Sequence, residues 1–439
     1  MKLLLALCGC ACLVGAVTAA VPAGGAPVTA ARHVPWSRNA VIYEVNLRQY
    51  TPEGTLAAFA RHLPELKALG ADILWLMPVQ PIGVKDRKGP LGSYYAIRDY
   101  QAINPEFGTL EDFRSVVQQA HALGMHVILD WVANHTSLDH PWITQHPEWY
   151  QQNAQGQITS YDYDNGTTIE HWSDVAGLDY RAPEVRAQMI AALRFWIRET
   201  GIDGFRCDVA GRVPVSFWND ARAALERDRS VFMLAEADKP ELAVRAFDMS
   251  YDWDLKDVFR AIGKGKAGAA EVRRHFEAPR QQFPADSYQM LFTSNHDLNS
   301  WDGSDEELYG PAHDALSVLS FTLPGMPLIY GGQEAGNTHR LLFFDRDPID
   351  WKTRARAPFY RGLVELRHGN PALASGSAGG PLEFIASDNP AVLAFSRHKG
   401  RNLVTVVVNL SAERQAYRLA GMAQSAALEA WAYSVDERH

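Results

Sequence analysis

From residue 36 onward the chain alternates short apolar segments with longer segments of helical periodicity. This alternation predicts a parallel sheet covered by helices, because each crossover helix returns the chain to the same edge of the sheet. Three helices are predicted over 55–70, 109–124 and 183–201, the second of them capped by Thr109. The strand-like segments are 40–47, 71–79, 125–132, 202–210, 230–237, 248–253, 288–297 and 326–334. Eight such segments favour a closed (β/α)8 barrel over an open doubly wound sheet.

Two further regions do not show this alternation of strand-like and helical segments. A barrel of this type needs about 250 residues, which leaves room in a chain of 439 for additional units. We expect the barrel to comprise residues 36–132 and 183–370, with residues 133–182 forming a small subdomain inserted after the third strand. After residue 371 the pattern changes to short alternating strands, so residues 371–439 are predicted to form a C-terminal antiparallel, β-sandwich-like domain.

The N-terminus carries a targeting pattern. Lys2 precedes an apolar run from Leu3 to Ala20 that ends in small residues, which predicts a signal peptide over residues 1–20 and a secreted or periplasmic protein. A retained membrane anchor is the alternative, since the run is just long enough to span a bilayer. Cys8 and its neighbours loosely resemble a bacterial lipobox, which leaves lipid anchoring as a further alternative. After processing we expect no stable membrane insertion.

Composition and net charge indicate which kinds of molecule the protein binds. The net charge is −9 and Lys and Arg form no long run, so a nucleic-acid interface is not expected. The 12 Trp residues suggest sugar-stacking surfaces, although we expect Trp142, Trp149 and Trp172 to form the core of the inserted subdomain. Cys207, the single cysteine outside the predicted signal, is expected to pack in the core. The sequence assigns no oligomeric state.

Four of the strand-like segments end in a polar, carboxylate-bearing tip, namely 126–135, 204–210, 232–238 and 292–297. In a parallel barrel the carboxyl ends of the strands meet at one mouth, so Asp208, Glu236 and Asp297 are predicted to converge there. A single Asp at a strand end is more often a cap or a turn residue. Four ordered segments, each with the corresponding residue in place, favour a catalytic site instead.

The same four segments resemble the four conserved regions of the α-amylase family of glycoside hydrolases, in the same order and with similar spacing. GFRCDVA is similar to the family's G-[FL]-R-x-D, LAEA to its Glu-bearing strand, SNHD to x-N-H-D, and DWVANH to D-x-V-x-N-H. The resemblance extends over roughly residues 36–410. It implies a retaining hydrolase that cleaves α-1,4-glucosidic bonds of starch-like or maltooligosaccharide substrates through a covalent glycosyl-enzyme intermediate.

The resemblance also assigns roles to the three carboxylates. Asp208 is implied as the nucleophile, Glu236 as the general acid and then the general base, and Asp297 as a carboxylate that binds sugar hydroxyls. Glu236 is expected to have a raised pKa because alanines flank it and two carboxylates lie nearby. Arg206 lies two residues before Asp208 on the same strand face, where it is predicted to keep Asp208 ionised, with Asp130 supporting it.

The remaining predicted contacts concern the bound sugar. By resemblance, His135 and His296 donate hydrogen bonds to its hydroxyls. Tyr95 is implied as the aromatic residue that stacks under the ring, with its neighbour Tyr94 as the alternative.

The sequence departs from the family where calcium is usually bound. Gly211 and Arg212 replace a Lys-His pair, and Gly177 stands where the family tends to have an Asp. Asn134 remains, but one amide does not make a site for a cation that takes six to eight oxygens. We therefore assign no metal ligand and no cofactor, while calcium stays possible with an incomplete ligand pattern. Asp162, Asp164 and Asp179 could form a different site.

Two other functions remain open. The same barrel could act as a transglycosylase, or as an α-glucosidase on another α-glucoside such as sucrose, trehalose or an α-1,6 link. A non-catalytic binding subunit is the third possibility, but such relatives typically lose catalytic carboxylates, and this chain keeps all three.

Overall fold

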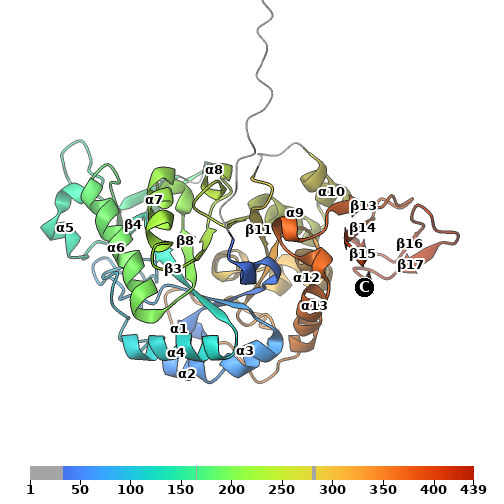
Figure 1. Cartoon of the computed structure of the whole chain (residues 1–439), viewed down its shortest axis with the longest axis horizontal. Coiled ribbons are helices and arrows are strands. Elements are labelled where there is room, and N and C mark those ends of the chain that lie inside the picture. The colour runs from blue at the N-terminus through green and yellow to red at the C-terminus, as the bar shows by residue number, and fades with distance from the viewer. Residues whose placement is uncertain (1–32, 165, 279–282) are drawn as a thin grey trace, which may run out of the picture.

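The computed structural model describes residues 33–164, 166–278 and 283–439, and at its centre eight parallel strands close into a barrel (Figure 1). Around the barrel the strands follow the order β1-β12-β11-β10-β9-β8-β3-β2. Each strand lies inside one of the eight predicted segments, which confirms the barrel. The strands are β1 Ile42–Val45, β2 Ile73–Leu76, β3 His126–Val132, β8 Gly204–Asp208, β9 Phe232–Ala235, β10 Met249–Tyr251, β11 Tyr288–Leu291 and β12 Met326–Tyr330.

Strand register brings the polar tips to the same height. Strands β3 and β8 are neighbours in the barrel, and the chain between them forms the inserted subdomain and one outer helix. In their parallel register Asp130 lies opposite Arg206. Cys207 of β8 lies opposite Ala235 of β9, so Glu236 follows at the level of Asp208. Cys207 itself is fully buried, as predicted for a packing residue.

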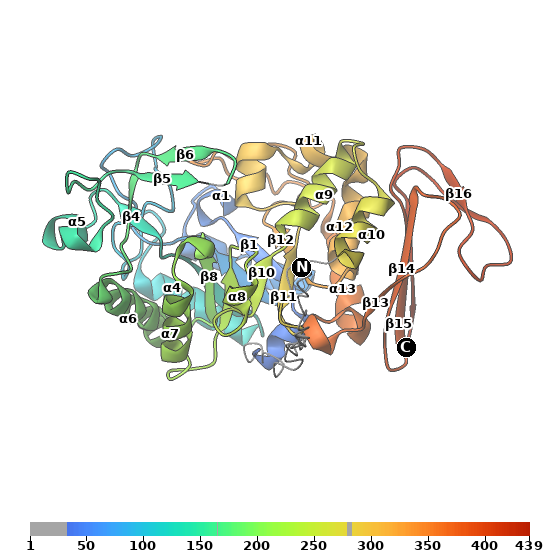
Figure 2. The same cartoon turned by 90° about the horizontal axis from the view of Figure 1, so that it is seen from above.

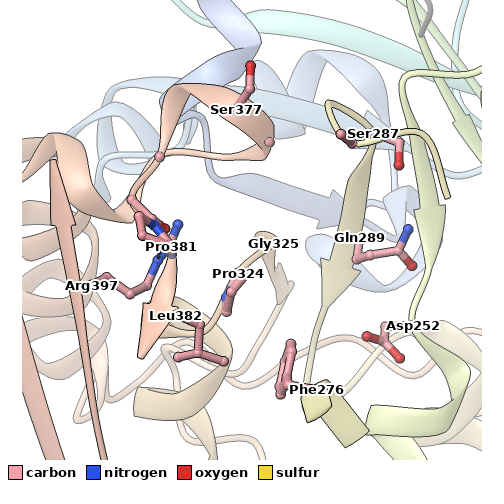
Figure 3. A pocket seen from close by; sticks show the side chains of 14 residues that line it. Asp252, Phe276, Ser287, Gln289, Pro324, Gly325, Ser377, Pro381, Leu382 and Arg397 are labelled. Atoms are coloured by element: carbon pink, nitrogen blue, oxygen red, sulfur yellow. Dashed lines mark hydrogen bonds between the residues drawn. The ribbon is translucent and has the colours of Figure 1, made fainter. Parts of the chain in front are cut away.

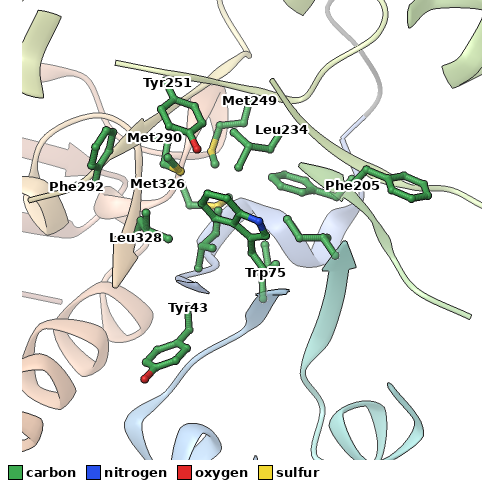
Figure 4. Close-up of a cluster of buried hydrophobic side chains, with 14 of the residues drawn as sticks. Tyr43, Trp75, Phe205, Leu234, Met249, Tyr251, Met290, Phe292, Met326 and Leu328 are labelled. Carbon is green, nitrogen blue, oxygen red and sulfur yellow. The ribbon is translucent and has the colours of Figure 1, made fainter. Parts of the chain in front are cut away.

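Large apolar side chains fill the barrel below these tips. Figure 4 shows Trp75, Leu234, Met290 and Met326 pointing toward one another from β2, β9, β11 and β12. All four are fully buried, so the barrel interior is a packed core rather than a channel. This core supplies the rigid base on which the polar tips stand.

Helices cover the outside of the barrel, and one of them differs from the prediction. The segment 55–70 forms two helices, α2 Leu56–Ala60 and α3 Leu63–Leu69, because Pro64 has no backbone N–H and fits only in a first helical turn. Thr109 caps α4 as predicted. The other helices are α1 Leu47–Tyr50, α4 Leu110–Ala122, α6 Pro183–Thr200, α7 Val215–Leu225, α8 Pro240–Ala243, α9 Trp253–Gly263, α10 Ala269–Glu277, α11 Asp305–Tyr309, α12 His313–Thr322 and α13 Ala357–Gly369.

The chain between β3 and α6 forms a small unit beside the mouth of the barrel (Figure 2). It contains two antiparallel pairs, β4 His135–Ser137 with β7 Val175–Gly177, and β5 Tyr161–Asp164 with β6 Ile169–Trp172. A short helix, α5 Trp142–Gln145, lies between these pairs in the sequence. The insertion therefore forms one wall above the barrel mouth.

The C-terminal residues form antiparallel β structure at the opposite side of the barrel (Figures 1 and 2). One sheet has the order β13-β14-β15-β18, and β16 pairs with β17 separately. Arg397 of β14 is buried and donates to backbone carbonyls of Thr322, Leu323 and Ala374, which ties this sheet to the end of α12. The strands are β13 Leu382–Phe384, β14 Val392–Lys399, β15 Asn402–Asn409, β16 Gln415–Tyr417, β17 Ala426–Leu428 and β18 Tyr433–Arg438.

The predicted signal peptide, residues 1–20, lies outside the described residues. Within the described ranges, no helix combines the length and the apolar character needed to cross a bilayer.

Candidate active site

A cavity of about 830 Å³ opens at the carboxyl ends of the barrel strands. Six of the seven residues predicted for the site line it, and they come from separate parts of the chain: Tyr95, His135, Asp208, Glu236, His296 and Asp297. Arg206, the seventh, is fully buried beneath the cavity. The structure thus brings all seven predicted residues to one place.

Arg206 binds three carboxylates at the floor of this cavity. One of its terminal nitrogens lies 2.9 Å from Asp130 Oδ1 and 3.2 Å from Asp208 Oδ1, and the other lies 2.8 Å from Glu236 Oε1. Asp130 is fully buried and contacts Arg206 as the sequence predicts. The positive charge of Arg206 therefore contacts both Asp208, the candidate nucleophile, and Glu236, the candidate acid.

The residue after Asp208 has an unusual backbone. Val209 has φ of 35° and ψ of 44°, in the left-handed region that β-branched residues rarely adopt. This conformation directs the Val209 N–H at Glu236, whose Oε2 accepts it at 2.7 Å. Backbone strain of this kind is concentrated at functional sites, and here it orients a carboxylate that faces the cavity.

Burial and neighbouring charges shift the pKa values of the two carboxyls. Burial raises the pKa of Asp208 well above its usual range, and repulsion from Glu236 adds to the rise. Burial also raises the pKa of Glu236, as expected, while Arg206 opposes the rise. Arg206 divides its charge among three carboxylates, so it only partly offsets the effect of burial on Asp208.

His296 and Tyr95 form a hydrogen-bonded cluster with Asp297. The Tyr95 hydroxyl lies 2.8 Å from His296 Nε2 and donates to Asp130 Oδ2 at 3.1 Å. Asp297 Oδ2 lies 3.3 Å from the same His296 nitrogen, and its side chain is 43% exposed, so it faces the open cavity. This cluster fixes the Tyr95 ring and leaves Asp297 free to meet a ligand.

Tyr95, rather than Tyr94, is the tyrosine of the site. Tyr94 is buried, donates its hydroxyl to Asn46 Oδ1 and packs its ring under the Arg48 guanidinium. Tyr95 lines the cavity. Of the two tyrosines that the sequence left open, Tyr95 is therefore the one placed to contact a ligand.

His135 enters the cavity from the inserted subdomain. Burial lowers its pKa to about 3, so the ring is neutral over the physiological range. Its Nδ1 lies 3.2 Å from the Asn134 amide nitrogen, and the Trp172 ring packs edgewise against it at 5.4 Å. The neutral ring lies in the lining of the cavity, where an imidazole can exchange a hydrogen bond with a sugar hydroxyl.

The three tryptophans of the insertion pack within the subdomain, as expected. Trp142 and Trp149 pack against each other. Trp172 packs against Tyr161 and Val175, and the β5–β6 hairpin also brings it to the lining of the cavity.

An aromatic wall made by Trp301, Phe343 and Phe344 also lines the cavity and was not predicted from the sequence. Trp301 is 51% exposed and lies 5.1 Å from Phe343 and 5.6 Å from Phe344. Phe343 continues the wall to Tyr95, with the two rings within 15° of parallel. Trp301 lies in a short π-helical turn, Leu298–Asp302, after β11, and Phe343 and Phe344 lie in the loop after β12, where no periodicity marks them. A half-exposed Trp on such a wall suits the apolar face of a sugar ring.

The residues present do not fit the calcium site that the resemblance suggests. A Cβ at Gly177 would lie 2.7 Å from the Tyr161 ring, so the position has no room for a carboxylate. Beside Gly211, the Lys239 ammonium donates to the Gly211 carbonyl at 2.8 Å. The cationic Lys239 side chain therefore occupies the space beside Gly211.

The alternative metal site is not assembled either. Asp162 pairs with His171, Asp164 accepts the Gly166 N–H, and Asp179 pairs with Arg181. Over residues 33–164, 166–278 and 283–439, no group of three or more His, Cys, Asp or Glu side chains is arranged to hold a metal ion.

A second cavity, of about 450 Å³, lies between the barrel and the C-terminal sheet (Figure 3). Its two charged groups already have partners: Asp252 pairs with His275 at 2.9 Å, and Arg397 donates to backbone carbonyls. It offers no unpaired charge for a ligand.

A closed parallel barrel with three carboxylates and a guanidinium at its carboxyl mouth is typical of glycoside hydrolases. Comparison with known proteins gives the family. Residues 36–358 match the alpha-amylase catalytic domain, and the chain belongs to the α-amylase family.

Individual relatives agree with this assignment. The crystal structure of an alpha-amylase from Lactobacillus plantarum superposes with a TM-score of 0.80 at 31% identity, covering 92% of this chain and all of that one. The alpha-amylase MalA of Haloarcula japonica is 29% identical over 86% of this chain and 56% of its own length. An alpha-1,4-glucan:maltose-1-phosphate maltosyltransferase of Rhodospirillum rubrum is 30% identical over 88% of this chain and 59% of its own. The chain thus spans less than two thirds of these two curated relatives.

Proposed function

We propose that this protein is a retaining glycoside hydrolase that cleaves α-1,4-glucosidic bonds of starch-like or maltooligosaccharide substrates. The observation that carries the proposal is the arrangement of Asp208, Glu236 and Asp297 around one cavity, with Arg206 beneath the first two. The apolar run at residues 3–20 supports export to the periplasm or the medium as part of the same proposal.

The first step forms a covalent intermediate. Asp208 attacks the anomeric carbon while Glu236 gives its proton to the departing glycosidic oxygen, so the C–O bond to the leaving group breaks as the bond to Asp208 forms. This step requires Glu236 to be protonated and Asp208 to be ionised when the substrate is bound. An ionised Asp208 then has Arg206 as its remaining counter-charge at 3.2 Å.

In the second step Glu236, now a carboxylate, removes a proton from water, and the resulting hydroxide displaces Asp208 from the sugar. Two inversions at one carbon give a product of the original anomeric configuration. During both steps Tyr95 supports the ring from below, while His135, His296 and Asp297 exchange hydrogen bonds with its hydroxyls. Those contacts strengthen catalysis to the extent that they tighten as positive charge develops on the ring.

Glycosyl transfer is the second candidate. Similarity to the maltosyltransferase of Rhodospirillum rubrum favours it, as does the loss of the family's Lys-His pair at Gly211 and Arg212 on the leaving-group side. In that case a sugar hydroxyl, rather than water, loses its proton to Glu236 in the second step.

The two candidates differ in their products. Purified protein is incubated with maltoheptaose, and the products are separated by length over time. Progressively shorter maltodextrins support hydrolysis, whereas products longer than the substrate refute it in favour of transfer. Turnover of sucrose or trehalose with no turnover of maltoheptaose refutes the proposed bond specificity.

A further inference from the structure

Glu44 is a buried carboxylate that none of the steps above uses. It lies in the middle of β1, its side chain is fully buried, and its Oε1 is 2.6 Å from His296 Nδ1. Its other oxygen, Oε2, is buried without a hydrogen-bond partner among the described residues. A buried carboxylate with one strong contact costs stability unless its partner carries the opposite charge.

Hydrogen counting indicates which charge His296 carries. The Tyr95 hydroxyl has one proton, and it donates that proton to Asp130 Oδ2, an acceptor-only carboxylate paired with Arg206. The Tyr95 oxygen can then only accept from His296 Nε2 at 2.8 Å. Asp297 Oδ2, at 3.3 Å, is a second acceptor facing the same nitrogen.

Both ring nitrogens of His296 therefore face acceptors, with Glu44 on one side and Tyr95 with Asp297 on the other. Burial raises the pKa of Glu44 and the His296 charge opposes that rise. Beside an ionised Glu44, a neutral imidazole has one N–H, so one of its nitrogens would direct a lone pair at a carboxylate or a phenol oxygen. An imidazolium satisfies all of these contacts. The edge of the Trp75 ring packs against His296 at 5.8 Å and excludes water from this side.

We propose that Glu44 is a positioning residue for the reaction: through its ion pair with Nδ1 it holds His296 as an imidazolium, with the Nε2–H directed at Tyr95 and Asp297. The inference rests on the proposed function. Through His296, Glu44 fixes the Tyr95 ring and places a positive charge beside Asp297, at the sugar-binding edge of the cavity.

The charges around His296 support this state. Asp297 and Glu44 raise the pKa of His296 to about 9, against burial and the Arg206 charge, which lower it. Asp130 and Glu236 also lie within electrostatic reach of the ring. Because the pKa is raised above its unfolded value near 6.5, the charged form persists at neutral pH and is lost as pH rises through about 9.

The test is the variant Glu44→Gln, which keeps the shape of the side chain and removes its charge. We expect kcat/KM on a nitrophenyl α-maltoside to fall about tenfold or more at pH 7.5, as for the loss of a charge-assisted hydrogen bond. We also expect the pKa of His296, read from its ring signals, to fall by about one pH unit or more, because His296 loses its counter-charge. Glu334→Gln is the matched control: Glu334 is equally buried and accepts the Tyr43 hydroxyl away from the cavity, so this substitution should leave the His296 titration in place.

A substrate-free measurement separates this inference from the proposed function. Histidine ring signals are followed by NMR from pH 6 to pH 10, with His296 assigned from a His296→Gln sample. A wild-type His296 that stays mostly charged at pH 8, and that titrates at least about one pH unit lower in Glu44→Gln, supports the proposal even if maltoheptaose is not hydrolysed. A wild-type His296 that is neutral at pH 7.5, or a folded Glu44→Gln in which His296 titrates at the wild-type pH, overturns it. If Glu44→Gln does not fold, the wild-type titration decides.

Discussion

Replacing Arg206 with Met is predicted to destabilise the protein in a pH-dependent way. The side chain is fully buried and lies within 3.2 Å of carboxylate oxygens of Asp130, Asp208 and Glu236. Removing one partner of a buried ionic cluster leaves uncompensated charge, at a cost of about 3–5 kcal/mol. Met retains apolar contact with Trp75, so the loss reports mainly on charge. We expect a fall of this size in the free energy of unfolding at pH 7.5, measured by urea denaturation.

The pH dependence gives the sharper test. Without Arg206 the pKa values of the three carboxyls rise further above their unfolded values of about 4. The variant therefore binds more protons when folded, and its stability is lost as pH rises through the raised pKa values and recovered as pH falls toward about 4.5. The stability gap between variant and wild type should shrink on acidification. A gap that is the same at both pH values would refute the electrostatic account of this cluster.

A control variant separates the charge cluster of the cavity from buried arginines in general. Arg222 is also buried and pairs with Asp248 at 2.7 Å, outside the cavity. Arg222→Met should lose stability as well, but the folded fraction should keep wild-type activity. Arg206→Met should be inactive even where it is folded.

The remaining predictions concern the reaction and its surroundings. Asp208→Asn and Glu236→Gln should each lower kcat at least about a thousandfold with an unchanged circular dichroism spectrum, and near-normal activity of either would contradict the assigned roles. Trp301→Ala should raise KM for maltoheptaose about two- to tenfold with little change in kcat, since it removes a stacking surface; an unchanged KM would exclude the aromatic wall from substrate binding. Chelation with EDTA should leave both the unfolding midpoint and the activity unchanged, and a drop in both would reveal a bound cation.

The barrel could be predicted from the sequence because its signals are local and repeated. Each strand is an apolar run of the length that a strand buried on both faces requires, and the candidate catalytic carboxylates stand at the ends of such runs. The split of 55–70 into two helices also has a local signal, because Pro64 marks the first turn of a new helix.

Contacts between distant segments were harder to foresee. The aromatic wall depends on where the segments after β11 and β12 fold back, and nothing in their composition fixes that path. The position of Trp172 in the cavity lining has the same origin, since hairpin register decides which face it occupies. Glu44 did leave a signal that could have been used: it is one charged residue inside an apolar strand, and a strand buried on both faces must provide such a residue with a partner.

The ionisation of Asp208 depends on contacts that form only in the folded chain. From the sequence, Arg206 and Asp208 share a strand face and form a simple pair. In the folded chain Asp130 and Glu236 claim the same guanidinium, so the charge available to Asp208 is smaller than the pair suggests.

The anomeric configuration of the first product tests the central claim most directly. Hydrolysis of a maltooligosaccharide is followed by proton NMR in the first minutes, before mutarotation mixes the anomers. Attack by Asp208 followed by water activated by Glu236 predicts that the new reducing end appears as the α-anomer. Initial appearance of the β-anomer would show inversion, and with it that no covalent intermediate forms on Asp208.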